Sequence, residues 1–155
     1  ISISNQAIGG RSSRTFITEG RWDKIMATLK KGDYVIMQFG HNDGGPLDDT
    51  ARARGTIRGI GNDSSEIYNP IRKIKETVFS YGWYMRKYVR EAKSKGAIPI
   101  VCSLVPRDNW KEGTVKPFFP SDHTHTNIDG AKVNAEIVVR ALKEIKPGSL
   151  VNYLK

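Results

Sequence analysis

The sequence contains a single cysteine, Cys102, among 155 residues, so it cannot form a disulfide within the chain. Cys102 lies in the apolar stretch IPIVCSLV, where a cysteine behaves as a small buried hydrophobic residue. No apolar run approaches the roughly 20 residues that a membrane-spanning helix needs. Internal repeats and low-complexity tracts are absent as well. We therefore expect a single globular domain over residues 1–155 and no membrane partner.

Acidic residues are also scarce, because 25 lysines and arginines face only 16 aspartates and glutamates and give a net charge of +9. A basic surplus of this size favours polyanionic partners such as nucleic acid, an anionic membrane or an acidic polysaccharide. The basic residues are spread along the chain, and the densest group, MRKYVREAKSK, is explained by a solvated helix face. No nucleic-acid recognition motif accompanies the charge, so a nucleic-acid partner is not expected.

Two short apolar runs, residues 33–40 and residues 97–105, are typical of buried strands in a parallel sheet. Residues 2–5 resemble the end of a further strand. Between the two runs, residues 44–69 are rich in Gly, Asp, Ser, Arg and Thr and show no periodicity. This composition predicts a long polar loop, and a loop of that length inside a compact domain is usually functional or mobile.

The sequence predicts three helices, and the second and third of them rest on apolar residues spaced three and four apart. The first covers residues 22–31 and is closed by Gly32, the second extends from Pro70 to a stop at Gly96, and the third begins after the cap Asn127. The second helix joins the two apolar runs into a β-α-β unit, so the predicted class is α/β with a mostly parallel sheet. In such sheets, sites gather at the carboxyl ends of the strands.

The loop FPSDHTHTN, before the last helix, combines a carboxylate with two of the three histidines of the chain. Asp122 and His125 are three residues apart, so a turn can bring the carboxylate to one imidazole nitrogen. The other nitrogen could then accept a proton from a nucleophile. Two other interpretations stay open: Asp122 or Thr124 could cap the helix, or His123 and His125 could bind zinc. Metal is disfavoured, because alternate residues of an extended chain point to opposite sides and no further ligand cluster is evident.

Two more polar segments lie beside predicted elements, NQAIGGRSS and QFGHNDGG. Asn42, after a predicted strand, could offer its side-chain amide to an oxyanion, and Gly10 could offer a backbone N–H at close approach. Turn geometry alone would also explain glycine and asparagine at these places.

Taken together, the segments NQAIGGRSSRTF, DYVIMQFGHNDGG and FPSDHTHT resemble the SGNH branch of the GDSL hydrolases, and within it the rhamnogalacturonan acetylesterase group, carbohydrate esterase family twelve. The resemblance implies a three-layer α/β/α sandwich with a central parallel sheet, and a serine esterase without metal or cofactor. In that family a serine attacks the ester carbonyl. Carried over by motif, His125 is the general base, Asp122 orients it, and Gly10 and Asn42 are donors of the oxyanion hole.

The chain departs from the family pattern in two places. The family's nucleophile motif, Gly-Asp-Ser, does not occur in the sequence, and the segment around residues 111–116 is too short for the helix and strand that relatives carry there. We expect a domain that lacks the first strand and a later βα unit, either because residues of a longer chain are joined across gaps, or because it is a fragment or a shortened natural relative. Ser12, Ser13 and Ser121 are not evidently placed to replace the nucleophile.

The function that the resemblance implies is removal of O-acetyl groups from pectic rhamnogalacturonan, by a secreted or periplasmic protein acting on an acetylated acidic plant polysaccharide. That polysaccharide carries a carboxylate in each repeat, which suits the basic charge. Arg11, Arg14, Arg52 and Arg54 lie in or near the predicted site loops, and with His41 they are candidates for substrate binding. Acetylated xylan is the alternative substrate, and a polysaccharide-binding protein without catalytic activity is the alternative function.

Overall fold

The computed structural model describes residues 2–104 and 125–144. The chain divides into two compact units, one formed by Ser4–Leu104 and the other by Ile1–Ile3 with Val105–Lys155. The first unit carries every described helix and strand except the last helix.

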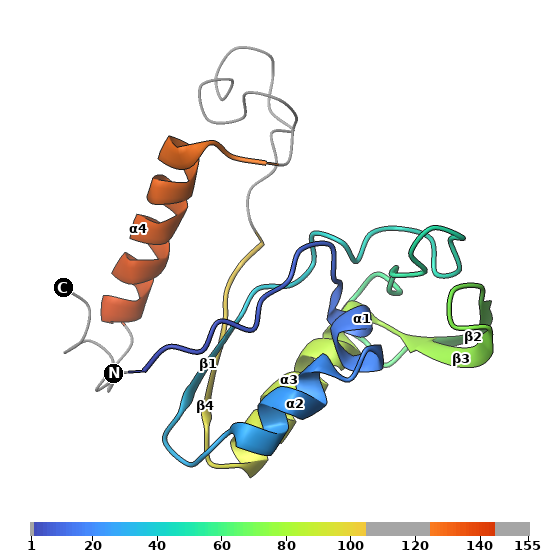
Figure 1. Cartoon of the computed structure of the whole chain (residues 1–155), viewed down its shortest axis with the longest axis horizontal. Coiled ribbons are helices and arrows are strands. Elements are labelled where there is room, and N and C mark those ends of the chain that lie inside the picture. Colours follow the sequence, from blue (N-terminus) through green and yellow to red (C-terminus); the bar gives the residue numbers. More distant parts are fainter. Residues whose placement is uncertain (1, 105–124, 145–155) are drawn as a thin grey trace. The chain divides into compact units, whose positions relative to one another are not determined.

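A pair of parallel strands lies along one side of the helices of the first unit (Figure 1). β1 (Tyr34–Met37) pairs with β4 (Ile98–Val101), with Tyr34 opposite Ile98 and Met37 opposite Val101. The helix α3 (Tyr81–Ser94) lies between them in the chain and contacts β4. The α/β class and the parallel pairing predicted for the two apolar runs are therefore confirmed, although both strands are shorter than the runs.

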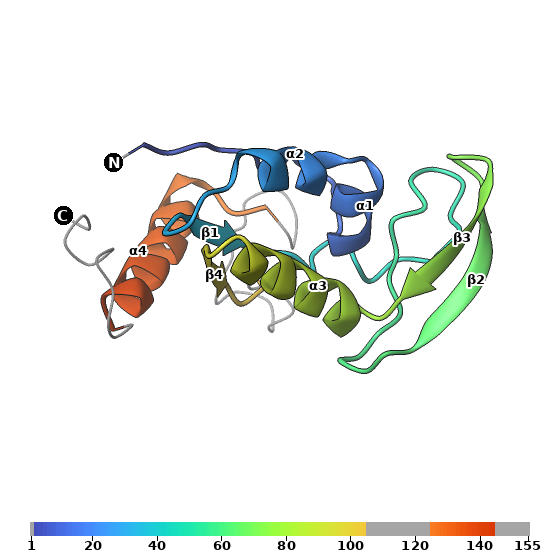
Figure 2. The same ribbon diagram turned by 90° about the horizontal axis from the view of Figure 1, so that it is seen from below.

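Two short helices precede β1 in the chain. α1 (Ser13–Thr18) was not expected from the sequence, and it begins with a capping box in which the Ser12 and Thr15 side chains each accept from the other residue's backbone N–H. α2 (Arg21–Thr28) matches the first predicted helix but ends before Leu29. Figure 2 shows α1 and α2 along one side of α3, and α1 contacts both other helices.

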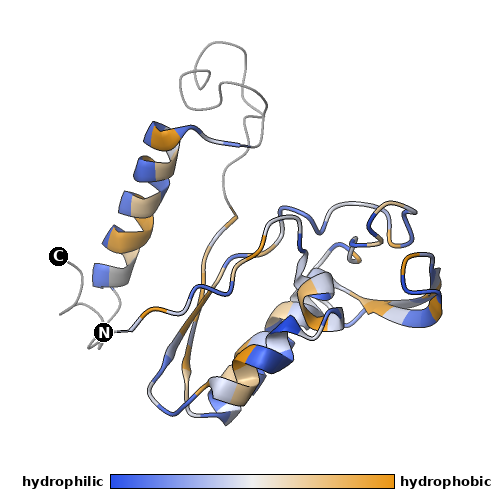
Figure 3. Ribbon diagram, in the orientation of Figure 1, coloured by the Kyte–Doolittle hydropathy of each residue, from blue (hydrophilic) through white to orange (hydrophobic). Residues whose placement is uncertain are grey.

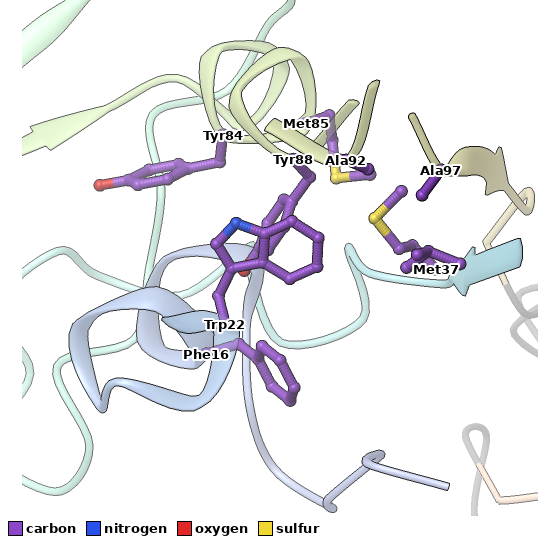
Figure 4. Packing of buried hydrophobic residues seen from close by; sticks show 9 residues of the cluster. Phe16, Trp22, Met37, Tyr84, Met85, Tyr88, Ala92 and Ala97 are labelled. Atoms are coloured by element: carbon purple, nitrogen blue, oxygen red, sulfur yellow. The ribbon is translucent and has the colours of Figure 1, made fainter. Parts of the chain in front are cut away.

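The core lies between these three helices and one face of the parallel strands. Its buried residues are Phe16, Trp22, Val35, Met37, Tyr84, Met85, Tyr88, Ala92 and Ala97. The rings of Trp22 and Tyr88 meet edge to face with centroids 4.7 Å apart (Figure 4). The Tyr88 hydroxyl donates to the carbonyl of Ser13 at 2.6 Å, so α3 fixes the start of α1 from inside the core.

The other face of the parallel strands is not covered in the same way. Val35 and Met37 are buried, whereas Ile36 between them is 53% exposed, and Ile98, which pairs with Tyr34 on the same face as Ile36, is also exposed. Figure 3, which colours the ribbon by hydropathy, shows that β1 and β4 consist largely of hydrophobic residues. The expectation of strands buried on both faces is therefore wrong for the described residues, since the helices of the first unit pack on one face only. Cys102, expected to be buried, is half-buried.

The segment between Pro70 and Ser80 is a hairpin arm and not the start of a long helix. β2 (Ser64–Asn69) pairs antiparallel with β3 (Ile74–Phe79). Positions 74 and 78 are one helical turn apart, but they also share a face of a strand, and the β-branched residues Ile74, Thr77 and Val78 favour the strand. The apolar spacing is therefore compatible with both periods, and the prediction of a helix between Pro70 and Ser80 is wrong.

Side-chain hydrogen bonds fix the ends of the hairpin. The Asn69 side chain accepts from the backbone N–H groups of Ile71 and Arg72, which closes the turn before β3. Ser80 caps α3 by accepting from the N–H of Trp83, and the stop at Gly96, with φ of 73°, is as predicted. The expected loop over residues 44–69 thus ends at Asp63. Residues 2–5 form no strand, so that expectation is wrong too.

The described helix of the second unit is α4 (Ile128–Glu144). The Asn127 side chain accepts from the N–H of Gly130 at 2.9 Å, which confirms the predicted cap. Among the described helices, none is long and apolar enough to cross a membrane.

Candidate functional site

Two loops of the first unit meet beyond the carboxyl end of β1. The side-chain amide of Asn42 donates to the backbone carbonyl of Arg11 at 3.0 Å. Arg11 follows Gly10 directly, so the structure brings together the two residues that the family motif assigns to the oxyanion hole. Asn42 is half-buried, and Gly10 is partly exposed. Both lie at the place where α/β proteins build their sites.

The conformation at Gly10 explains why a glycine is needed. Its φ is +78°, a left-handed value that is strained for residues with a side chain. A Cβ atom at this position would also lie 3.0 Å from Nη1 of Arg52. Arg54 donates from its Nη1 atom to the carbonyl of Gly10 at 3.2 Å. The glycine loop is therefore held from outside by the segment that follows residue 50.

Asp43 connects the two loops from the inside, and the sequence analysis did not select it. Its carboxylate accepts from the backbone N–H of Ser13 at 3.1 Å, from the Ser13 hydroxyl, and from the N–H of Gly40 at 3.0 Å. Burial raises the pKa of Asp43 above its ordinary value, against the lowering effect of the hydrogen bonds from Ser13, Gly40 and Thr56. The sequence signal that could have identified Asp43 is its position next to Asn42, after a predicted strand.

The other candidate arginines differ in how they are engaged. Arg11 forms an ion pair with Glu19 at 3.0 Å. Arg14 is fully buried, forms an ion pair with Glu76 of β3 at 2.8 Å, and donates to the carbonyls of Leu47 and Gly55. Arg14 therefore anchors the hairpin and the polar loop to α1, and it is not available to a substrate at the surface.

Comparison with known proteins supplies the family. A rhamnogalacturonan acetylesterase of Emericella nidulans is 32% identical to this chain over 184 residues, which cover 92% of the chain and 74% of that protein. This chain belongs to the rhamnogalacturonan acetylesterase family. The family consists of carboxylic ester hydrolases, so the resemblance drawn from the GHND and DHTH segments is confirmed.

Other members of the rhamnogalacturonan acetylesterase family are similar at lower identity. A probable rhamnogalacturonan acetylesterase of Bacillus subtilis, YesY, is 28% identical over 89% of the chain and 54% of its own length, and RhgT of the same organism is 25% identical over 94% and 75%. The 184 aligned residues of the Emericella protein exceed the 155 of this chain, so part of that stretch has no counterpart here. No model of a known protein family matches.

Among solved structures, the crystal structure of YxiM from Bacillus subtilis resembles this acetylesterase-family chain with a TM-score of 0.47 at 22% identity, and the match covers 88% of the chain and 30% of YxiM.

Of the other residues that the acetylesterase motif assigns to the site, the structure describes His125 but not Asp122. His125 is exposed and lies two residues before the cap Asn127 of α4, in the second unit. Asp122 and the segment 111–116 lie outside the described residues, so the Asp122–His125 pair stays a prediction. His41 is half-buried between Gly40 and Asn42. Among the described residues, no three or more His, Cys, Asp or Glu side chains form a group that could hold a metal ion.

Proposed function

We propose that this chain supplies the acid–base pair and the oxyanion donors of a serine-type acetylesterase that removes O-acetyl groups from rhamnogalacturonan. The family membership supports the reaction class. The observation that carries the site is the hydrogen bond from Asn42 to the carbonyl of Arg11, because it joins the asparagine loop to the glycine loop at one place. Substrate and localisation follow from the same proposal, since a plant cell-wall polymer requires a secreted or periplasmic enzyme.

The oxyanion donors follow from the geometry of Asn42. A side-chain amide has two N–H donors. One is bound by the Arg11 carbonyl, which fixes the rotation of the amide. The second has no acceptor among the described residues and is available to the oxygen that becomes negative in the tetrahedral intermediate. The backbone N–H of Gly10 is the second donor in this proposal, and donors fixed before the reaction stabilise such charge without reorganisation.

In the proposed mechanism a serine attacks the acetyl carbonyl while His125 takes its proton. His125 then protonates the oxygen of the departing sugar, which leaves an acetyl-serine, and a water molecule activated by the same histidine releases acetate. Asp122 holds the imidazole in the required tautomer. No Gly-Asp-Ser motif occurs in the 155 residues, so this reaction requires a serine-bearing segment in addition to them.

The absence of that motif also favours a second candidate, a protein that binds the polysaccharide without hydrolysing it. Release of acetate from acetylated rhamnogalacturonan decides between the two. We expect the 155-residue chain alone to release none, and a chain that also carries the family's Gly-Asp-Ser segment to release acetate faster from rhamnogalacturonan than from acetylated xylan. Equal rates on both polymers would overturn the substrate, and no release by the extended chain would favour the binding protein.

A further inference from the structure

The segment Asp49–Arg54 has a defined backbone, fixed by one aspartate. The Asp49 carboxylate accepts from the N–H of Ala51 at 3.1 Å and from that of Arg52 at 2.7 Å, and the Asp49 carbonyl accepts from the N–H of Ala53 at 3.0 Å. Ala53 is only 1% exposed. Because Ala53 is buried between them, the backbone at Arg52 and Arg54 has a fixed position in the loop.

The side chains of Arg52 and Arg54 converge on Gly10. Their Nη1 atoms lie 3.0 Å and 3.8 Å from the point where a Cβ atom of Gly10 would be. Arg54 donates to the carbonyl of Gly10 and is half-buried, whereas Arg52 is exposed and donates no side-chain hydrogen bond to any described residue. Two guanidinium groups are thus close to one neutral backbone segment.

Within the part of the chain that the structure describes, these two charges differ from their neighbours in having no counter-ion. Arg11 is paired with Glu19 and Arg14 with Glu76, but no carboxylate of the described residues lies within ion-pair distance of Arg52 or Arg54. Two like charges in this arrangement attract an anion. Guanidinium groups have a planar fork of donors that matches a carboxylate, and such charge-assisted hydrogen bonds are stronger than neutral ones.

We propose that Arg52 and Arg54 form a binding site for a uronate carboxylate of the polysaccharide, next to the oxyanion donor Gly10. This inference rests on the proposed function, because it places the carboxylate close along the polymer to the acetylated sugar. The pair would then select acetyl groups on acidic polymers over those on neutral ones. It also explains why no carboxylate of residues 2–104 or 125–144 pairs with these arginines, since such a partner would compete with the substrate.

The same charges could instead act directly on the reaction. A positive field beside Gly10 would stabilise the negative oxygen of the intermediate, and it would then raise the turnover of neutral and acidic esters alike. A carboxylate site acts on binding and only on substrates that carry the carboxylate. A pair of ligands that differ in this group alone therefore separates the two roles.

The test measures binding to the 155-residue chain by calorimetry, which needs no turnover and so can succeed or fail independently of the esterase proposal. The ligands are deacetylated rhamnogalacturonan oligosaccharides and the same oligosaccharides with each carboxyl reduced to an alcohol. We expect the acidic form to bind more tightly, with a preference that falls as salt is raised. The preference should fall about three- to fivefold in Arg52→Gln and about tenfold in the double variant with Arg54→Gln.

Arg58→Gln is the matched control, because Arg58 is an exposed arginine of the same loop and should leave the preference unchanged. Arg52→Lys is the second variant, since it keeps the charge but loses the fork, and we expect an intermediate preference. The inference is overturned if wild type binds both oligosaccharides equally, or if the folded double variant keeps the full preference. It is also overturned if the double variant loses affinity for both forms to the same extent.

Discussion

Asn42 and Arg11 are 31 positions apart in the sequence, and the side-chain amide of Asn42 donates to the Arg11 carbonyl across 3.0 Å. The bond joins the loop after β1 to the loop before α1. It has two consequences: it holds Gly10 beside Asn42, and it leaves the second N–H of the amide without an acceptor among the described residues. The predicted roles of both loops therefore depend on the orientation of a single side chain.

Replacing Asn42 by alanine should lower turnover strongly in any version of the protein that releases acetate. Loss of one oxyanion donor costs about 10²- to 10³-fold in kcat. The KM should change little, because the donor acts on charge that develops only in the transition state. Steady-state kinetics on acetylated rhamnogalacturonan would measure both constants.

Asn62→Ala is the matched control for that experiment. It makes the same chemical change at an exposed asparagine whose side chain only accepts from Arg86. We expect kcat to stay within about twofold of wild type, since surface substitutions away from sites change little. If the two variants lose the same activity, Asn42 has no special role.

Asp43→Asn should destabilise the first unit, although it changes few atoms. The carboxylate accepts from three donors of Ser13 and Gly40, and an amide would turn an N–H₂ group towards at least one of them. Leaving buried donors unsatisfied costs about 1–3 kcal/mol each. Urea denaturation followed by tryptophan fluorescence should show a lower midpoint with an unchanged slope. A midpoint equal to that of wild type would contradict the assigned contacts.

How well the sequence predicted the fold depended on how distinctive each pattern was. The two apolar runs were distinctive, and the structure confirms the parallel pair. Asn127 was one of several candidate caps for the last helix, and the structure confirms Asn127 as a cap of α4. The residues from Ile74 to Phe79 were ambiguous, because apolar positions four apart fit a helix face and a strand face equally. The decision between them came from contacts with β2 and from Glu76 reaching Arg14, which lie far away in the sequence.

The site divides in a similar way. Gly10 and Asn42 were selected because polar residues at strand ends converge in α/β sheets and because the family motif marks them, and their role in an oxyanion hole stays a prediction. Asp43 was missed, since its burial depends on Ser13 and Thr56 from other segments. Arg14 was a candidate for substrate binding, because nothing in its local sequence shows that Glu76 and two carbonyls surround it.

Substitution tests the role of His125 as the base in any version of the protein that releases acetate. His125→Ala should lose nearly all activity, because removing the base leaves only binding and the oxyanion donors. Rates of acetate release by the variant and by wild type would show this. Equal activity in the variant would remove His125 from the mechanism.

The pair of Arg14 and Glu76 should make stability depend on acid pH. Burial raises the pKa of Glu76, but hydrogen bonds from Arg14 and Asn69 and the charge of Arg14 outweigh that effect and lower it below its ordinary value. A lowered folded pKa means that the unfolded chain binds the proton first. The stabilisation is therefore present above the ordinary glutamate pKa and is lost as the pH falls through the lowered value.

Glu76→Gln removes this titration and leaves Arg14 buried without a counter-charge. We expect a loss of about 3–5 kcal/mol at neutral pH. The difference between variant and wild type should shrink as the pH falls, because protonation of Glu76 removes the same charge from the wild type. Urea denaturation at a series of pH values would measure it. Glu66→Gln, at an exposed position of the same hairpin, is the control and should lower stability at no pH. A difference for Glu76→Gln that stays constant with pH would show that the ion pair contributes nothing through its charge.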